Sequence, residues 1–324
     1  MKSYWVLALS FYTTQLCAHG LTDWRTDSHA FASYGGLVPR KMATMTNDDG
    51  TRNRFLIDPE FLRTKLSEFS GAADLDLDGR TLRIQERGSL EGRELARRYL
   101  RREYERLGFV VSEQSYSVKG TNLIAEKVGT DPSKVLIVSS HYDSVRNAGA
   151  DDNGSGTISA LALAQALSGS SHYTLRIVAF DEEERGLLGS RAYVAQLAQS
   201  QNLDRVIADI DVEMNGYNER KDGAFHVIDC DRADSKYISA LVMEGVDKMN
   251  LPLQRSEACT DRSDHDAFWQ KNKAAVVLSE NFFGGDSNPC YHAACDKVDI
   301  LDFNYMANVT RAVTWAAASI VEML

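Results

Sequence analysis

Short runs of apolar, β-branched residues alternate with longer amphipathic stretches from Phe55 to the end of the chain. Short runs bounded by turn residues are typical of buried strands, whereas stretches with apolar residues three or four positions apart are typical of helices. The predicted strands are residues 109–118, 122–128, 135–140, 175–180, 206–212 and 274–278. The predicted helices are residues 91–107, 154–167, 187–197, 235–249 and 302–323. This alternation predicts an α/β domain with a mixed, mostly parallel central sheet and helices on both faces.

The N-terminal region does not follow this pattern. One basic residue, Lys2, precedes an apolar stretch that ends near Ala18 and is shorter than the roughly 20 residues needed to span a bilayer. This arrangement predicts a signal peptide in residues 1–18, with a buried first helix as the alternative. Residues 19–54 are polar and weakly periodic, so a propeptide, a linker and a surface segment all remain open. The α/β domain is then expected in residues 55–324.

Length and charge narrow the class of protein. A chain of 324 residues with 44% hydrophobic residues can form one large α/β domain or two small ones. The net charge of -10 argues against nucleic-acid binding, which requires clustered Lys and Arg. No stretch after the signal peptide is apolar enough to anchor the chain, so we expect no membrane partner.

The cysteines indicate disulfides if the protein is exported. Cys17 would be lost with the signal peptide, which leaves an even number. The four that remain are Cys230, Cys259, Cys290 and Cys295. A Cys290–Cys295 bridge would fix the loop that carries His292, and Cys230–Cys259 is then the other pair. A cysteine-based zinc site is the alternative, but the sequence lacks the paired C-x-x-C spacing typical of such sites.

Histidine and acidic side chains follow the predicted strand 135–140. The segment His141-Tyr-Asp143-Ser comes first, and Gly-Ala-Asp151-Asp152-Asn-Gly comes soon after. In open α/β sheets, ligands bind at the carboxyl ends of the strands. Asp143 suits a carboxylate that orients a metal-bound histidine, with local hydrogen bonding as the alternative. Two adjacent buried aspartates are costly without a cation, although helix capping would account for Asp152 alone.

Two more predicted strands end in acids. Residues 175–180 are followed by Asp-Glu-Glu183-Glu184-Arg-Gly-Leu-Leu-Gly-Ser, and residues 206–212 by Glu213-Met-Asn-Gly. A late histidine, His292, lies between two cysteines. Consecutive acidic residues usually lie exposed on the surface. Here they directly follow a predicted buried strand, which favours a functional site instead. Because zinc binds histidine and carboxylate groups, and two zinc ions can share a carboxylate, the set predicts a two-metal site with one spare base.

These motifs, in this order along the chain, resemble the secreted two-zinc aminopeptidases of the leucyl-aminopeptidase-like metallopeptidase family. The matching motifs are His-x-Asp-Ser, Gly-Ala-Asp-Asp-Asn, Glu-Glu-x-Gly-Leu-x-Gly-Ser, acid-Met-x-Gly and the late histidine. The resemblance covers the chain from Phe55 onward. It implies the zinc exopeptidase fold, two zinc ions, and peptide substrates with a free N-terminus.

The resemblance also implies metal ligands. Asp151 would bridge both zinc ions, with His141 and Glu213 on one, and Glu184 and His292 on the other. Family members hold a cis peptide between the two aspartates that match Asp151 and Asp152, and Asp152 would support the ligands together with Asp143. The position of Glu213 is Asp in the best-known aminopeptidases, so Asp211 is the fallback ligand.

Further roles are implied for residues near the ligands. Glu183 matches the general base of the family, which takes a proton from the attacking water. Tyr291 matches a tyrosine that hydrogen-bonds the developing oxyanion, with loop packing as the alternative. Glu182 could hold the α-amino group of the substrate. The histidine of Ser263-Asp264-His265 is not a ligand in the family pattern, so this segment is expected to support the site.

Other functions remain open at this point. A glutaminyl-peptide cyclase has the same fold and nearly the same ligands but works with one zinc. A carboxypeptidase would need a basic clamp for the terminal carboxylate of its substrate. A binding protein could have kept the fold and lost the chemistry. The leading hypothesis is a monomeric aminopeptidase, secreted or periplasmic.

Overall fold

The computed structural model describes residues 55–323, which belong to one compact unit. The expected signal peptide, residues 1–18, and the N-terminal segment, residues 19–54, lie outside the described residues. Within residues 55–323, no helix is both long enough and apolar enough to cross a membrane.

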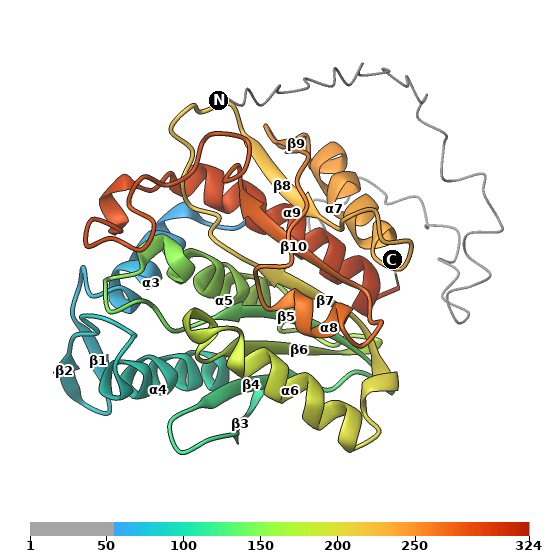
Figure 1. The fold of residues 1–324 in the computed structure, drawn as a ribbon, viewed down its shortest axis with the longest axis horizontal. Coiled ribbons are helices and arrows are strands. Elements are labelled where there is room, and N and C mark those ends of the chain that lie inside the picture. Colours follow the sequence, from blue (N-terminus) through green and yellow to red (C-terminus); the bar gives the residue numbers. More distant parts are fainter. Residues whose placement is uncertain (1–54, 324) are drawn as a thin grey trace, which may run out of the picture. The chain divides into compact units, whose positions relative to one another are not determined.

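The central sheet has eight strands in the order β3-β4-β6-β5-β7-β10-β8-β9 (Figure 1). They are β3 (Val110–Ser115), β4 (Thr121–Lys127), β5 (Asp131–His141), β6 (Tyr173–Phe180), β7 (Val206–Val212), β8 (Ala224–Ile228), β9 (Gln254–Ser256) and β10 (Ala275–Glu280). The four central strands β6, β5, β7 and β10 run parallel, as does the β8–β9 pair. The β3–β4, β4–β6 and β10–β8 pairs are antiparallel. The predicted mixed, mostly parallel sheet is confirmed.

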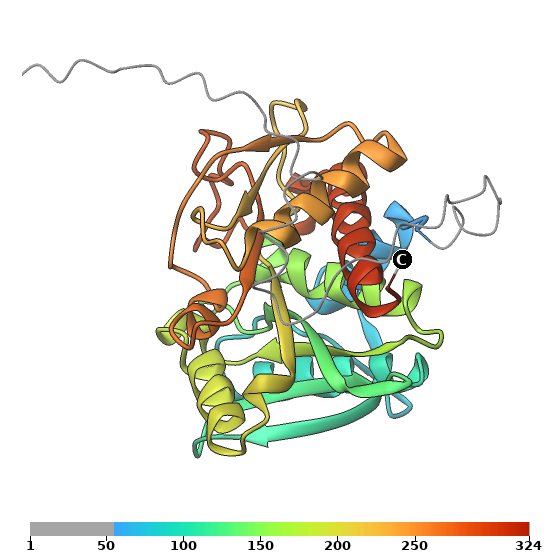
Figure 2. The same ribbon diagram turned by 90° about the vertical axis from the view of Figure 1, so that its right-hand side faces the viewer.

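Helices cover both faces of the sheet. They are α3 (Pro59–Phe69), α4 (Leu90–Arg106), α5 (Gly156–Ala166), α6 (Leu188–Gln199), α7 (Lys236–Met249), α8 (His265–Trp269) and α9 (Phe303–Val321). Buried residues of α3, α4, α5, α7 and α9 share one apolar core, and those of α6 and α8 share the other. Figure 2 shows α9 and α6 on opposite sides of the sheet.

The central strands are apolar on both sides because both faces are buried. In β5, Leu136 and Val138 belong to the first core, whereas Val135 and Ile137 belong to the second. A strand buried on both faces shows a continuous apolar run rather than alternation. This is why the central strands were predictable from the sequence.

Several shorter elements were not predicted. The hairpin of β1 (Leu75–Leu77) and β2 (Arg80–Leu82), together with β8, β9 and α8, span at most five residues each, too few for a periodic pattern. Helix α3 did carry a signal. Asp58 caps its N-terminus by accepting a hydrogen bond from the Glu60 backbone, and Pro59 occupies the first helical position.

The fold brings the functional segments to one edge of the sheet. Strands β5, β6, β7 and β10 are parallel neighbours, so the loops that follow them meet at their carboxyl ends. Helix α5 starts directly against the end of β7, where a Cβ atom at Gly156 would lie 2.1 Å from the Val212 carbonyl oxygen. Glycine therefore permits the close approach that holds the β5–α5 loop against β7.

Candidate metal centre

Two groups of ligand-type side chains lie side by side at this edge. His141, Asp152 and Glu213 form the first group, and Asp152, Glu184 and His292 form the second. In each group the ligand atoms lie within 4.8 Å of one another. Asp152 contributes to both groups, so one carboxylate connects them.

The distances show how Asp152 joins the groups. The His141 Nε2 atom lies 3.3 Å from Asp152 Oδ1 and 3.4 Å from Glu213 Oε2. On the other side, His292 Nε2 lies 3.1 Å from Asp152 Oδ2 and 3.0 Å from Glu184 Oε2. Each carboxylate oxygen of Asp152 therefore faces a different histidine.

The expected positions of Asp151 and Asp152 are exchanged in the structure. Asp151 lies in neither group, because its carboxylate accepts hydrogen bonds from the Gly216 backbone (3.0 Å) and the Asn288 side chain (3.0 Å) and also hydrogen-bonds Glu280. The expectation that Asp151 is the shared residue and Asp152 a supporting one is therefore wrong. The expected cis peptide is also one residue later, between Asp152 and Asn153. Neighbouring side chains in this loop point in different directions, so only one aspartate can reach both histidines.

The acidic turn after β6 is held by Asp143. The backbone N–H groups of Glu183 and Glu184 donate to the Asp143 carboxylate over 3.1 and 3.4 Å, and Asp143 Oδ1 also lies 3.4 Å from His141 Nδ1. Asp143 thus links the first histidine to the turn that carries the acids. The Glu183 Oε2 atom lies 3.9 Å from His141 Nε2, but neither group includes Glu183.

Glu182 is not available to a substrate amine. Its side chain is only 5% exposed, and its carboxylate lies 3.2 Å from Arg93 Nη1 and 2.8 Å from Arg185 Nη1. The Tyr116 hydroxyl donates to it as well, over 3.2 Å. The expected amino-group role of Glu182 is therefore not supported, because arginines already neutralise this carboxylate.

Glu213 is held by side chains from two loops. Its Oε2 atom accepts hydrogen bonds from Asn153 Nδ2 (3.0 Å) and Ser263 Oγ (3.2 Å). Asp211, the fallback ligand, lies in neither group and accepts from Ser263 Oγ (2.8 Å) and the His265 backbone (3.1 Å). Glu213 is thus the ligand-type residue that the end of β7 delivers.

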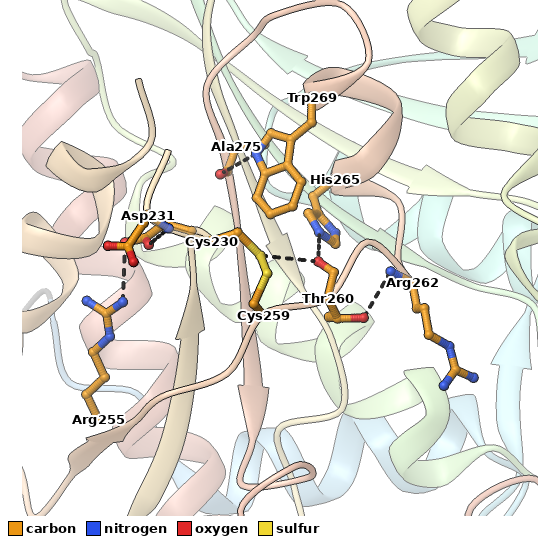
Figure 3. The surroundings of a disulfide bond; sticks show 10 residues. Cys230, Asp231, Arg255, Cys259, Thr260, Arg262, His265, Trp269 and Ala275 are labelled. Atoms are coloured by element: carbon orange, nitrogen blue, oxygen red, sulfur yellow. Dashed lines mark hydrogen bonds and ion pairs between the residues drawn. A yellow bond between two sulfur atoms is a disulfide. The ribbon is translucent and has the colours of Figure 1, made fainter. Parts of the chain in front are cut away.

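The segment that carries Ser263 is tied down by a disulfide (Figure 3). Cys230, just after β8, is bonded to Cys259, and the carbonyl of the adjacent Thr260 accepts a hydrogen bond from His265 Nε2 (3.1 Å). The Trp269 indole, one turn further along α8, donates to the Ala275 carbonyl over 3.0 Å. The segment therefore supports the site rather than supplying a ligand.

The second disulfide holds the loop of His292. Cys290 and Cys295 are bonded, as expected, and both predicted disulfides are present. The ring of Tyr291 is stacked on His292 with 3.8 Å between centroids, and it meets the Phe282 ring edge-on at 5.2 Å. Tyr291 is partly exposed beside the second group.

The charges of the site are poorly balanced without a cation. Burial and, after it, the charge of Asp152 raise the pKa of Glu184 to about 8. Burial raises the pKa of Glu213 to about 7, although His141 opposes this. Burial also raises the pKa of Glu183 well above its usual range, with His141 opposing and the charges of Asp264 and Glu213 adding to it. The site thus contains more carboxyl groups than its histidines can neutralise.

The residues fit a pair of zinc ions. Two imidazole nitrogens and three carboxylates, one of them shared, are the donor set that zinc accepts. Glu184 Oε1 is buried and accepts no hydrogen bond. Buried carboxylate oxygens without hydrogen bonds are costly unless a cation meets them.

Several residues near the site escaped the sequence analysis. Glu280, at the end of β10, accepts hydrogen bonds from the backbones of Tyr217 (2.9 Å) and Asn288 (3.1 Å). Asp296 accepts from the backbone of Asp152 over 3.1 Å. Glu280 had a detectable signal, since it is one more acid at a strand end. Asp296 and the buried Arg87 had none, because their partners are distant in sequence.

Comparisons with known proteins find similar enzymes. One relative is leucine aminopeptidase 2 of Arthroderma otae, which is 32% identical over 227 residues. The match covers 63% of this chain and 45% of the relative. The chain thus spans about half the length of the curated relatives it matches.

Solved structures share the fold. The LapA aminopeptidase of Legionella pneumophila has a TM-score of 0.73 at 20% identity, covering 88% of this chain and 78% of that one. BSAP, a zinc aminopeptidase from Bacillus subtilis, has a TM-score of 0.57 at 26% identity, covering 62% and 50%. The glutaminyl cyclase of Porphyromonas gingivalis has a TM-score of 0.67 at 16% identity, covering 82% and 99%.

The family model described as peptidase family M28 matches residues 122–317, which include all five ligand-type residues. This match extends over more than half of the chain. The resemblance noted in the sequence is thereby confirmed, and the chain belongs to peptidase family M28.

Proposed function

We propose that this protein is an exported zinc-dependent aminopeptidase that hydrolyses the N-terminal residue from peptides. The observation that carries the proposal is Asp152, whose two carboxylate oxygens face the histidines of two ligand groups. A spare carboxylate, Glu183, lies beside them. The names of the relatives, leucine aminopeptidase 2 and a zinc aminopeptidase, agree with this activity.

In this proposal Asp152 takes the bridging position. His141 and Glu213 would complete one zinc site, and Glu184 and His292 the other. When bound, the zinc ions would polarise the scissile carbonyl and lower the pKa of a shared water towards neutrality. Glutamate in place of aspartate at position 213 adds one methylene, and Asn153 and Ser263 hold its carboxylate in place.

Glu183 is proposed as the general base. It would accept the proton of the attacking water and pass it to the leaving amine. Burial favours the neutral form of Glu183, and a nearby cation would favour its ionised form, so its pKa can move towards the working pH. Tyr291 is proposed to donate its hydroxyl to the oxygen that develops negative charge.

The experiment that tests this proposal combines metal counting with one substitution. The wild-type protein should bind two zinc ions per chain, lose hydrolysis of amino-acid anilides on chelation, and regain it when zinc is added. Glu183→Gln should bind both ions and stay folded but lose turnover by roughly 10²- to 10⁴-fold, the usual contribution of a general base. Unchanged turnover in Glu183→Gln would refute the general-base role.

A glutaminyl-peptide cyclase is the second candidate, and the fold shared with the Porphyromonas gingivalis enzyme favours it. Such an enzyme would need one zinc and would cyclise an N-terminal glutamine instead of hydrolysing the peptide. One zinc per chain together with cyclisation and no hydrolysis would establish this alternative. The complete second ligand group supports the aminopeptidase.

Export and oligomeric state complete the proposal. The two disulfides support a secreted or periplasmic location, since disulfides persist in oxidising compartments. We expect residues 1–18 to be removed and the mature protein to be a monomer. N-terminal sequencing and light scattering of the exported protein test these two points.

A further inference from the structure

Arg87 lies in the interior beneath the metal centre and is completely buried. Its guanidinium donates three short hydrogen bonds to backbone carbonyls, from Nε to Tyr142 (2.8 Å), from Nη1 to Ala148 (2.6 Å) and from Nη2 to Gly149 (2.7 Å). A longer one reaches the Phe69 carbonyl (3.5 Å). None of these acceptors is a carboxylate, so this buried cation has no direct ion pair.

The three short hydrogen bonds join both ends of the loop that connects the ligands. Tyr142 directly follows His141, and Gly149 lies three residues before Asp152. The loop between them contains no helix or strand, so contacts with the rest of the protein, Arg87 among them, hold it in place. The Arg87 backbone adds to these contacts, donating to Ser144 Oγ (3.1 Å) and accepting from the Ser144 N–H (3.3 Å).

Gly149 makes room for this arrangement. Its φ of 54° lies in the left-handed region, and a Cβ atom there would be 2.7 Å from Arg87 Nη2. A larger residue would therefore clash with the guanidinium as well as strain the backbone. Arg87 and Gly149 thus form one interlocked unit at the entrance to the Asp152 turn.

The charge of Arg87 matters as well as its shape. Burial lowers its pKa to about 10, so the guanidinium stays protonated at neutral pH, and the nearby charges of Asp296, Asp152 and Asp143 favour that form. A buried cation without an ion pair is costly for folding unless hydrogen bonds compensate it, and the three short ones that Arg87 donates all go to the loop between His141 and Asp152. This suggests that the position serves the site and not stability alone.

We propose that Arg87 is a positioning residue of the metal centre. Its planar guanidinium holds the two ends of residues 142–149 at a fixed separation, so that His141 and Asp152 face each other. Its charge offsets part of the negative charge of the carboxylates from behind. This inference rests on the proposed zinc-binding function.

The test measures zinc affinity by competition with a chromophoric chelator, in the full-length protein with its metal removed. Arg87→Lys keeps the charge but loses the planar set of donors, and Arg87→Met loses both. Arg176 provides matched controls, Arg176→Lys and Arg176→Met, because it is also largely buried but pairs with Glu126 and Tyr193, in the middle of β6.

We expect both Arg87 variants to bind zinc about ten- to hundredfold more weakly than the wild type, which is the usual cost of losing a group that supports a metal ligand. The Arg87→Met variant should bind zinc more weakly than Arg87→Lys. The rise in melting temperature on zinc addition should shrink accordingly. The Arg176 variants should lose melting temperature but keep wild-type zinc affinity.

Three outcomes overturn the inference. They are wild-type zinc affinity in the Arg87 variants, an equal loss of affinity in the Arg176 variants, and failure of Arg87→Lys to fold while Arg176→Lys folds, which would assign Arg87 to stability alone. If Arg87→Met does not fold, Arg87→Lys decides. A wild-type protein that binds no zinc would instead refute the proposed function itself.

Discussion

The two ligand groups share Asp152 but are built differently. The first group takes His141 from the end of β5 and Glu213 from the end of β7, and the His141 side chain is 2% exposed. The second takes Glu184 from a short turn and His292 from a disulfide-bonded loop, and the His292 side chain is 40% exposed. The sheet therefore fixes the first group directly, whereas the second depends on a turn held by Asp143 and on a loop held by a disulfide. We expect the second group to bind zinc more weakly.

The largest effect is expected where the groups meet. Asp152→Asn removes the shared charge, so both zinc ions should bind far more weakly, and activity should fall by more than the roughly hundredfold typical of outer partners. Asp151→Asn is the matched control, because Asp151 is buried next to it but lies in neither group. Metal counting after dialysis checks this. Loss of zinc in Asp151→Asn alone would restore the role first expected for Asp151.

The next effect separates the two groups. His141→Ala and His292→Ala should each lose one zinc ion per chain, but only His141→Ala should also destabilise the metal-free protein. The reason is that it leaves a buried cavity and removes the imidazole nearest Glu213. We expect a cost of about 2 to 4 kcal/mol for His141→Ala and under about 1 kcal/mol for His292→Ala, measured by urea unfolding. Equal costs would mean that the sheet does not make the first group more rigid.

A smaller effect is expected from the two disulfides. Cys290→Ser with Cys295→Ser should weaken zinc binding at the second group, because the loop of His292 is released. Cys230→Ser with Cys259→Ser should act on the first group, because it releases the segment whose Ser263 holds Glu213. Each pair of substitutions should lower zinc affinity at its own group by about tenfold. If removing one disulfide lowered zinc affinity at the other group, or at both groups equally, the two groups would not be held independently as described.

The smallest effect concerns the strand beneath Glu213. Burial raises the pKa of Asp209 well above its usual range, with the charge of Asp211 adding to it. Above the unfolded pKa of about 4, the native state therefore keeps a proton that the unfolded state has lost, and stability falls as the pH rises. The Asp209→Asn variant cannot ionise at this position. Between pH 5 and 8 its unfolding free energy should therefore fall less than that of the wild type, and the difference should be roughly 1 kcal/mol.

Calorimetry at both pH values measures this difference. The exposed Asp204→Asn is the matched control for the loss of one carboxylate. The same pH dependence in Asp209→Asn as in wild type would show that this strand carries no buried proton.

Much of the fold was predictable from the sequence because the central strands are buried on both faces. Their apolar runs and the acids that end them stand out locally, so the pattern pointed to His141, residues 181–184 and Glu213, and the family resemblance then implied Glu184 and His292 as ligands. The close spacing of Cys290 and Cys295 likewise indicated one disulfide, and Cys230–Cys259 was then the remaining pair. Apart from the Cys230–Cys259 pair, each of these signals lies within a few consecutive residues.

The tertiary structure decided which groups face one another. The sequence could not tell whether Asp151 or Asp152 reaches both histidines, because the direction of adjacent side chains in an irregular loop depends on distant partners such as Asn288 and Glu280. It also could not show that Arg93 neutralises Glu182, or that Arg87 holds the loop of Tyr142 and Gly149. Local sequence determines burial and element type through periodicity, whereas hydrogen-bond partners are set only when the strands and helices pack together.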